Sequence, residues 1–155
     1  MIRAEVDAIE PSAFVPMPNY PSGWTAFLLD AGRWESEFPR VDFDANRRRC
    51  PHTYRTIAGI EGLMLGGFLR LEPGGSIGPH EDFRDDDMVR CHLGLHLPVA
   101  EQGYWPELAA RLMDVRQTHS ARNDGDQARV TLVIDVRMRF VVPTGSFGSW
   151  QPPTT

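Results

Sequence analysis

Apolar and polar positions alternate along much of this chain, which is the pattern of β-strands with one buried face. The clearest case is residues 89–97, where every second residue is apolar and the intervening face carries Arg90 and His92. The longest case is residues 129–142, with Arg129 on the more polar face. Clusters of β-forming residues predict further strands at 25–29, 54–57, 64–71 and 112–116.

Helical patterns are short and few. Residues 30–38 form one candidate helix with Asp30 as its N-cap, and residues 106–111 form another of one or two turns. The 13 prolines and 14 glycines interrupt the chain often, and residues 11–23 resemble an extended lead-in. Short strands, tight turns and few helices are typical of a β-sandwich or barrel. We therefore predict a mainly β fold, a double-stranded β-helix (jelly-roll or cupin-like) with one or two short helices.

Length and composition restrict the class of protein further. The 155 residues suit a single domain, and we expect its core at about 54–142, between the irregular lead-in and a Gly-, Ser- and Pro-rich tail. The net charge of -5 argues against nucleic acid as a partner, because proteins that bind it usually carry a basic patch. The sequence does not decide whether the chain forms a homodimer.

The same composition gives expectations about location. The N-terminal residues lack the apolar stretch of a secretory signal, and no run approaches the 18 apolar residues of a membrane span. The two cysteines, Cys50 and Cys91, are too few for a disulfide framework. We therefore expect a cytoplasmic protein that does not enter a membrane.

Three residues form a candidate metal site. On an extended backbone His80 and Asp82 point to the same side, and His119 follows His80 after 39 residues, which allows it to reach the opposite sheet. Two imidazoles and one carboxylate can hold one face of an octahedral iron(II) and leave the other face open. Taken singly, each residue is more often an ordinary polar one: a turn histidine, a member of an acidic run, or a surface histidine.

Three further residues are candidates for binding a carboxylate near that site. Arg129 lies ten residues beyond His119 and could hold a carboxylate through two hydrogen bonds, although a strand-end arginine is often simply exposed. Arg90 and His92 share one strand face and can both donate hydrogen bonds. The alternative is that this face is a polar outer surface.

Residues for substrate recognition are weakly indicated. A run of three arginines could bind a substrate carboxylate, but such a run is somewhat more often a solvated basic turn. The candidates are Arg47, Arg48, Arg49 and Arg55, with Trp24 and Trp105 as further pocket residues.

Four blocks in order resemble the aspartyl/asparaginyl β-hydroxylase family of iron(II)- and 2-oxoglutarate-dependent oxygenases. The family shows an L-x-P-G turn before a proximal Pro-His, an R-x-H-L-G-L strand, a D-x-x-x-x-H-x-x-x-N segment, and an arginine ten residues after that histidine. Leu69 stands where members often have serine, which leaves the partner of Arg129 open. The matching stretches are FLRLEPGGSIGPH at 68–80, VRCHLGLHLP at 89–98, MDVRQTHSARN at 113–123 and RVTLVID at 129–135.

The resemblance implies roles for individual residues. His80 and His119 fall on the iron-binding histidines, and Asp82 supplies the carboxylate that some members lack, which favours hydroxylation over halogenation. Arg129 falls on the clamp for the distal carboxylate of 2-oxoglutarate, His92 lies near its metal-side carboxylate, and Arg90 serves cosubstrate or substrate. Asn123 would fix the loop that carries His119, with Asp114 in a similar supporting role.

The resemblance therefore implies a dioxygenase that uses iron(II), 2-oxoglutarate and O2. We expect it to hydroxylate an unactivated carbon of a small carboxylate-bearing substrate, an amino acid or short peptide, in Asp/Asn β-hydroxylation or proline-type hydroxylation, with natural-product biosynthesis as one setting. Two alternatives stay open. A non-oxygenase metal cupin, an isomerase or lyase, would keep the histidines without needing Arg129, and a non-catalytic ligand-binding β-sandwich would need no metal at all.

Overall fold

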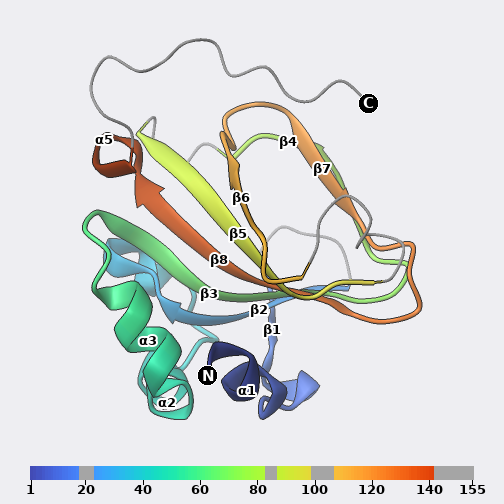
Figure 1. The fold of residues 1–155 in the computed structure, drawn as a ribbon, viewed down its shortest axis with the longest axis horizontal. Helices are drawn as coiled ribbons and strands as arrows, with labels where there is room; N and C mark the ends of the chain where they lie inside the picture. Colours follow the sequence, from blue (N-terminus) through green and yellow to red (C-terminus); the bar gives the residue numbers. More distant parts are fainter. Residues whose placement is uncertain (18–22, 83–86, 99–106, 142–155) are drawn as a thin grey trace.

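Two β-sheets face each other in the computed structural model, which describes residues 1–17, 23–82, 87–98 and 107–141 (Figure 1). The larger sheet has the strand order β1-β2-β3-β8-β5-β6, and the smaller sheet pairs β4 with β7. Neighbouring strands are antiparallel throughout. The strands are β1 (Val15–Pro16), β2 (Trp24–Asp30), β3 (Leu63–Leu71), β4 (Ser76–His80), β5 (Met88–His96), β6 (Ala110–Met113), β7 (His119–Arg122) and β8 (Arg129–Arg137).

The chain passes from one sheet to the other as it proceeds. It runs from β3 in the larger sheet to β4 in the smaller and back to β5, and it repeats the exchange through β6, β7 and β8. This alternation is the winding of a double-stranded β-helix. The predicted fold class, mainly β with a jelly-roll arrangement and short helices, is therefore confirmed.

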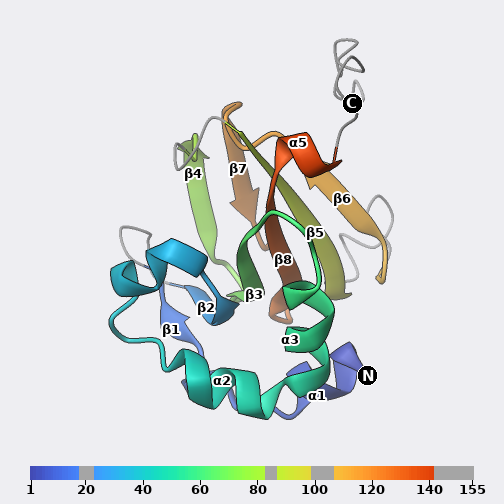
Figure 2. The ribbon, with the colours of Figure 1, turned by 90° about the vertical axis from the view of Figure 1, so that its left-hand side faces the viewer.

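Short helices of the N-terminal third cover the side of the larger sheet that faces away from the smaller one, and the last helix follows β8 at the end of that sheet (Figures 1 and 2). More helices are present than the sequence predicts, and several lie in the N-terminal third. The helices are α1 (Ile2–Asp7), η1 (Pro11–Ala13), η2 (Gly32–Glu37), α2 (Phe43–Arg49), α3 (Pro51–Ala58) and α5 (Met138–Val141).

The alternation along the strands gives the larger sheet two buried faces. One face packs against the N-terminal segment and α3 through residues such as Phe27, Phe68 and Leu132. The other face packs toward β4 through residues such as Leu69 and Ile77. The core also contains Val6, Ile9 and Phe14, so it extends well beyond the expected range of 54–142.

One predicted strand is a helix. Residues 54–57 belong to α3, although their β-forming composition favours a strand. Pro51 occupies the start of α3, where a missing N–H costs nothing. The Glu5 carboxylate, from α1, accepts hydrogen bonds of 2.8 Å from the backbone N–H groups of His52 and Thr53. A cap from a distant segment therefore decides this helix, and local composition could not reveal it.

The strand boundaries near the C-terminal end differ from those predicted. The helix expected at 106–111 is wrong: residue 106 lies outside the described residues, and a turn at 107–108 leads into β6. The strand expected at 112–116 is β6, which begins and ends earlier. The long strand expected at 129–142 is confirmed up to Arg137, and α5 begins at the next residue, Met138.

The other predictions agree more closely. The strands expected at 25–29, 64–71 and 89–97 correspond to β2, β3 and β5. The helix expected at 30–38 is a 3-10 helix that begins at Gly32, and Asp30 ends β2 while its carboxylate accepts the Gly32 N–H at 2.9 Å. Gly74 adopts a φ of 72° in the turn that ends β3, a conformation that glycine adopts without steric cost. Within the described residues, no helix has both the length and the apolar character needed to cross a membrane.

Candidate metal centre

The smaller sheet sets two histidines directly opposite each other. His80 is the last residue of β4, His119 is the first residue of β7, and the two are Cα partners in the β4–β7 ladder. Their ring centroids lie 4.2 Å apart. The expectation that His119 would come from the opposite sheet is wrong, because the two histidines lie on adjacent strands of one sheet.

Backbone carbonyls fix the orientation of both rings. His80 Nδ1 lies 2.8 Å from the carbonyl oxygen of Gly78, and His119 Nδ1 lies 2.9 Å from that of Gln117. A carbonyl oxygen only accepts, so each Nδ1 carries the hydrogen and donates it. Each Nε2 therefore has a lone pair available for a metal ion, which is how second-shell contacts select the ligating nitrogen.

Asp82 completes the cluster. One ligand atom from each of His80, Asp82 and His119 lies within 4.8 Å of the other two, and His119 Nε2 is 3.7 Å from Asp82 Oδ2. The backbone N–H of Asp82 donates to Val115 O at 2.9 Å, which ties the residue to the segment before β7. Two imidazoles and a carboxylate on one side suit an iron(II) that keeps open positions. The donor set fits the metal implied by the sequence.

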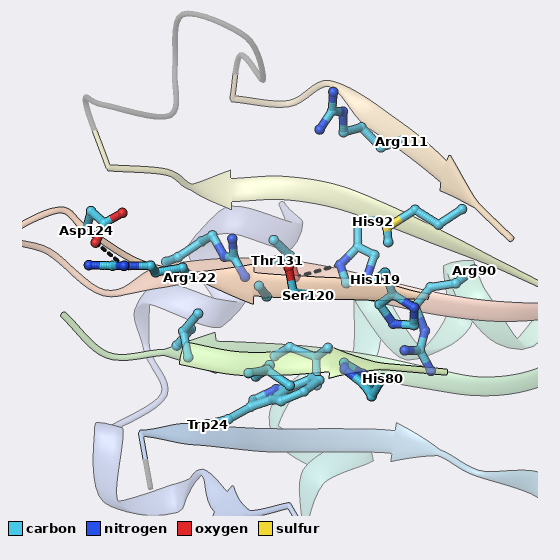
Figure 3. A pocket seen from close by; sticks show the side chains of 16 residues that line it. Trp24, His80, Arg90, His92, Arg111, His119, Ser120, Arg122, Asp124 and Thr131 are labelled. Atoms are coloured by element: carbon cyan, nitrogen blue, oxygen red, sulfur yellow. Dashed lines mark hydrogen bonds and ion pairs between the residues drawn. The ribbon is translucent and has the colours of Figure 1, made fainter. Parts of the chain in front are cut away.

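A cavity of about 340 Å³ opens beside this cluster (Figure 3). Both sheets contribute to its wall, and Trp24, expected as a pocket residue, lies 6.4 Å from His80 between ring centroids. The lining contains both apolar residues and several arginines. The lining residues are Trp24, Leu69, Leu71, Ile77, His80, Arg90, His92, Arg111, Met113, His119, Ser120, Ala121, Arg122, Asp124, Arg129 and Thr131.

Arg129 and His92, the residues predicted to bind the cosubstrate, both line the cavity. Arg129 opens β8, and Thr131, two residues on, lies 3.2 Å from His92 between Oγ1 and Nδ1. Burial, aided by the positive charges of Arg90 and Arg129, lowers the pKa of His92 from 6.5 to about 3. His92 is therefore neutral at pH 7 and can act as a hydrogen-bond donor without carrying charge.

Arg90 lines the cavity but makes its strongest contacts inside the protein. Its Nε and Nη2 donate to the two carboxylate oxygens of Asp135 at 2.7 and 2.8 Å, and its Nη1 donates to Asp82 Oδ2 at 2.6 Å. Burial alone would lower the pKa of Arg90, but the two carboxylates raise it above its ordinary value. The polar face of β5 is therefore not an outer surface at Arg90 and His92.

The expected supporting residues differ in what they contact. Asn123 is fully buried; its Nδ2 donates to Leu71 O at 2.9 Å and to Gln127 O at 2.8 Å, and its Oδ1 accepts the Gly125 N–H at 3.0 Å. These bonds anchor the end of β7, one strand length from His119. Asp114 instead accepts a hydrogen bond from Arg116, and this bond lowers the pKa of the Asp114 carboxyl.

The arginines expected to bind substrate do not line the cavity. Arg47 lies on α2, where it donates to Leu29 O at 2.8 Å and pairs with Glu35. Arg48 and Arg49 follow it on the same helix, and Arg55 on α3 contacts His52. These helices cover the outer side of the larger sheet, so all four candidates lie away from the cavity; Trp105 lies outside the described residues.

Two cavity residues, Arg111 and Thr131, and one residue beside the cavity, Asp135, which pairs with Arg90, were not singled out from the sequence. Arg111 of β6 is the Cα partner of His92, and Thr131 and Asp135 lie on the polar face of β8. The signal for Thr131 and Asp135 was the alternation itself, which placed them on the same strand face as Arg129. Arg111 gave no signal, because it fell in a segment expected to be helical.

The fold and the cluster together define a double-stranded β-helix protein with a His-Asp-His site at a polar cavity. The sequence matches the Aspartyl/Asparaginyl beta-hydroxylase family over residues 1–139, and the chain belongs to this family. It is thus a member of a hydroxylase family.

Two relatives with similar sequences are longer than this chain. The ornithine lipid ester-linked acyl 2-hydroxylase of Rhizobium tropici is 30% identical over 139 residues, covering 81% of this chain and 45% of the relative. Human aspartate beta-hydroxylase domain-containing protein 1 is also 30% identical, covering 77% of this chain and 32% of the relative. The chain therefore spans less than half the length of these curated relatives.

Two crystal structures are similar to this one at low sequence identity. A Pseudomonas putida prolyl-4-hydroxylase is 18% identical with a TM-score of 0.47, covering 89% of this chain and 86% of that one. A predicted oxalate decarboxylase from Thermotoga maritima is 13% identical with a TM-score of 0.46, covering 84% and 98%.

Proposed function

We propose that this protein is an iron(II)- and 2-oxoglutarate-dependent dioxygenase that hydroxylates an unactivated carbon. The observation that carries the proposal is the convergence of His80, Asp82 and His119, with ligand atoms within 4.8 Å of one another, at a cavity that Arg129 also lines. When bound, iron(II) with 2-oxoglutarate and O2 supplies the oxidant for the hydroxylation. The protein's own residues hold the metal and orient the two organic molecules.

In this proposal Arg129 pairs with the distal carboxylate of 2-oxoglutarate. A guanidinium can bind a carboxylate through two parallel hydrogen bonds, which fixes orientation as well as affinity. Neutral His92, beside Thr131, would donate to the metal-side carboxylate. An isomerase or lyase would have no need for this arginine.

The substrate we propose is a small carboxylate-bearing molecule, an amino acid or a short peptide. Arg111 adds positive charge to the cavity beyond Arg129, whereas Arg122 is paired with Asp124 of the same lining. The excess of positive charge favours an anionic ligand. The apolar lining residues, such as Trp24 and Ile77, would contact an apolar part of the substrate. Since one relative is named for hydroxylating a lipid acyl chain, fatty acyl compounds are the second class to test.

The test is iron-dependent formation of succinate from 2-oxoglutarate in air, with the twenty amino acids, short peptides and acylated amino acids as candidate substrates. We expect a basal rate that one class stimulates, and a His119→Ala variant that gives none. Tight metal binding without any succinate would instead indicate a non-oxygenase metal cupin. Absence of metal binding would indicate a non-catalytic ligand-binding protein.

A further inference from the structure

Three buried charged groups form a row that leads to the candidate metal centre. Asp135 on β8 is fully buried, Arg90 on β5 is 8% exposed, and Asp82 after β4 is also 8% exposed. Arg90 lies between the two carboxylates and donates to both, at 2.6–2.8 Å. Buried charges are costly unless they are paired and hydrogen-bonded, so this row is a specific arrangement and not an incidental surface contact.

The larger sheet fixes the position of Arg90. Arg90 and Asp135 are Cα partners in the β5–β8 ladder, so their side chains project from the same face of the sheet. Asp135 accepts from both Nε and Nη2, a side-on pairing that holds the plane of the guanidinium. Arg90 Nη1 is thereby aimed at Asp82.

Each of the three candidate metal ligands then has its own orienting contact. The rings of His80 and His119 are fixed by backbone carbonyls of the smaller sheet. Asp82 lies beyond the end of β4, and its carboxylate is oriented by Arg90 of the larger sheet. Ligating carboxylates are commonly hydrogen-bonded in this way, and loss of such partners typically weakens metal binding.

We infer that Arg90, held by Asp135, is a positioning residue that presents the Asp82 carboxylate to the metal, and that it is not a ligand of the cosubstrate. The inference rests on the proposed function, since it requires a metal at the site. It departs from the sequence-based expectation that Arg90 serves cosubstrate or substrate. Asp135, which pairs with Arg90, acts on Asp82 through that arginine.

Two conservative variants test the inference by metal binding in the absence of turnover. Asp135→Asn keeps the shape but removes the charge that holds Arg90, and Arg90→Lys keeps the charge but removes the planar donor set. Cobalt(II) is a suitable probe because its visible spectrum reports on its ligands. Calorimetry with cobalt(II) should give a Kd about 10–100-fold higher for both variants than for the wild type. The spectrum should also change, and the Kd of 2-oxoglutarate at saturating cobalt(II) should stay within about twofold of the wild type.

Arg47→Met is the matched control. It removes the ion pair with Glu35 and the 3.7 Å contact with Asp30 on the outer side of the larger sheet. It should lower the thermal stability while leaving cobalt(II) affinity and spectrum unchanged. A merely structural role for Asp135 would make its variant behave like this control.

Three results would overturn the inference. Wild-type cobalt(II) affinity and spectrum in either folded variant would show that the row does not position Asp82. An unchanged metal Kd with a raised 2-oxoglutarate Kd in Arg90→Lys would make Arg90 a cosubstrate ligand. Failure of the wild type itself to bind cobalt(II) would overturn the proposed function as well, which distinguishes that failure from the first two.

Discussion

His119 faces His80 directly across the two-stranded sheet, with ring centroids 4.2 Å apart. The pair is created by the register of β4 with β7, and each ring is oriented by the carbonyl two residues before it in the chain. The metal-binding nitrogens are thus aimed by the backbone of one small sheet. Disturbing that ladder should therefore disturb the site without touching either histidine.

The candidate ligands should be indispensable for metal binding. His119→Ala removes one of three ligands and should abolish stoichiometric iron(II) or cobalt(II) binding, measured by calorimetry and metal analysis after desalting. His96→Ala is the control, because His96 contacts Asp7 at 2.6 Å away from the cavity. If His119→Ala retained one tightly bound metal ion, the assignment of this cluster would be wrong.

Arg129 should affect the cosubstrate and spare the metal. Arg129→Ala removes a charge-assisted pairing of about 1.5–3 kcal/mol, so the Kd of 2-oxoglutarate should rise roughly 10- to 150-fold. The Kd of cobalt(II) should be unchanged. The Kd of 2-oxoglutarate for Arg129→Lys should lie between those of the wild type and Arg129→Ala. Equal weakening of metal and cosubstrate would contradict the role proposed for Arg129.

Asn123 should stabilise the β7 end of the smaller sheet. Asn123→Ala leaves the carbonyls of Leu71 and Gln127 and the N–H of Gly125 without this buried partner. The unfolding free energy should fall by about 2–4 kcal/mol, measured by urea denaturation. The neighbouring Asp124→Ala, at an exposed ion pair with Arg122, should cost less than about 1 kcal/mol. Equal costs would argue against the anchor.

The stability of the metal-free protein should fall in mild acid. His92 has a folded pKa of about 3 against an ordinary 6.5, so only the unfolded state takes up its proton between these values. The free energy of unfolding is therefore unaffected by His92 above pH 6.5 and falls as the pH drops from 6.5 toward 3. Between pH 7 and pH 5 the loss is about 2 kcal/mol. Urea unfolding of wild type and His92→Gln at both pH values checks this. An equally steep decline in the variant would refute the assignment to His92.

The arginines on the outer helices should not matter for the chemistry. Arg48→Gln and Arg55→Gln change exposed side chains of α2 and α3, away from the cavity. They should leave metal and 2-oxoglutarate affinity unchanged and shift stability by less than about 0.5 kcal/mol. Loss of cosubstrate affinity in either variant would show that these helices reach the site.

The sequence predicted the parts of the molecule whose signals are local. Alternation located β3, β5 and β8. The spacing of residues, together with the resemblance to the family, pointed to His80, Asp82 and His119, which the structure brings together. It could not reveal α3, because the Glu5 carboxylate that caps this helix lies about fifty residues earlier in the chain.

Other side-chain contacts at and near the site could not be predicted from the spacing of residues in the sequence. The pairing of Arg90 with Asp135 depends on the register of β5 with β8, two strands separated by β6 and β7 in the chain. The bulge between Gly94 and His96 takes His96 out of the face it would share with His92, so it contacts Asp7 instead. Strand register and bulges are decided by tertiary packing, which one sequence does not display.

The most direct test of the proposed function is the visible spectrum of the protein mixed anaerobically with iron(II) and 2-oxoglutarate. We predict a weak metal-to-ligand charge-transfer band that needs both additions and is absent in His119→Ala. Admission of air should then consume the band and form succinate. A protein that binds iron(II) but develops no band with 2-oxoglutarate, and forms no succinate in air, would contradict the proposal.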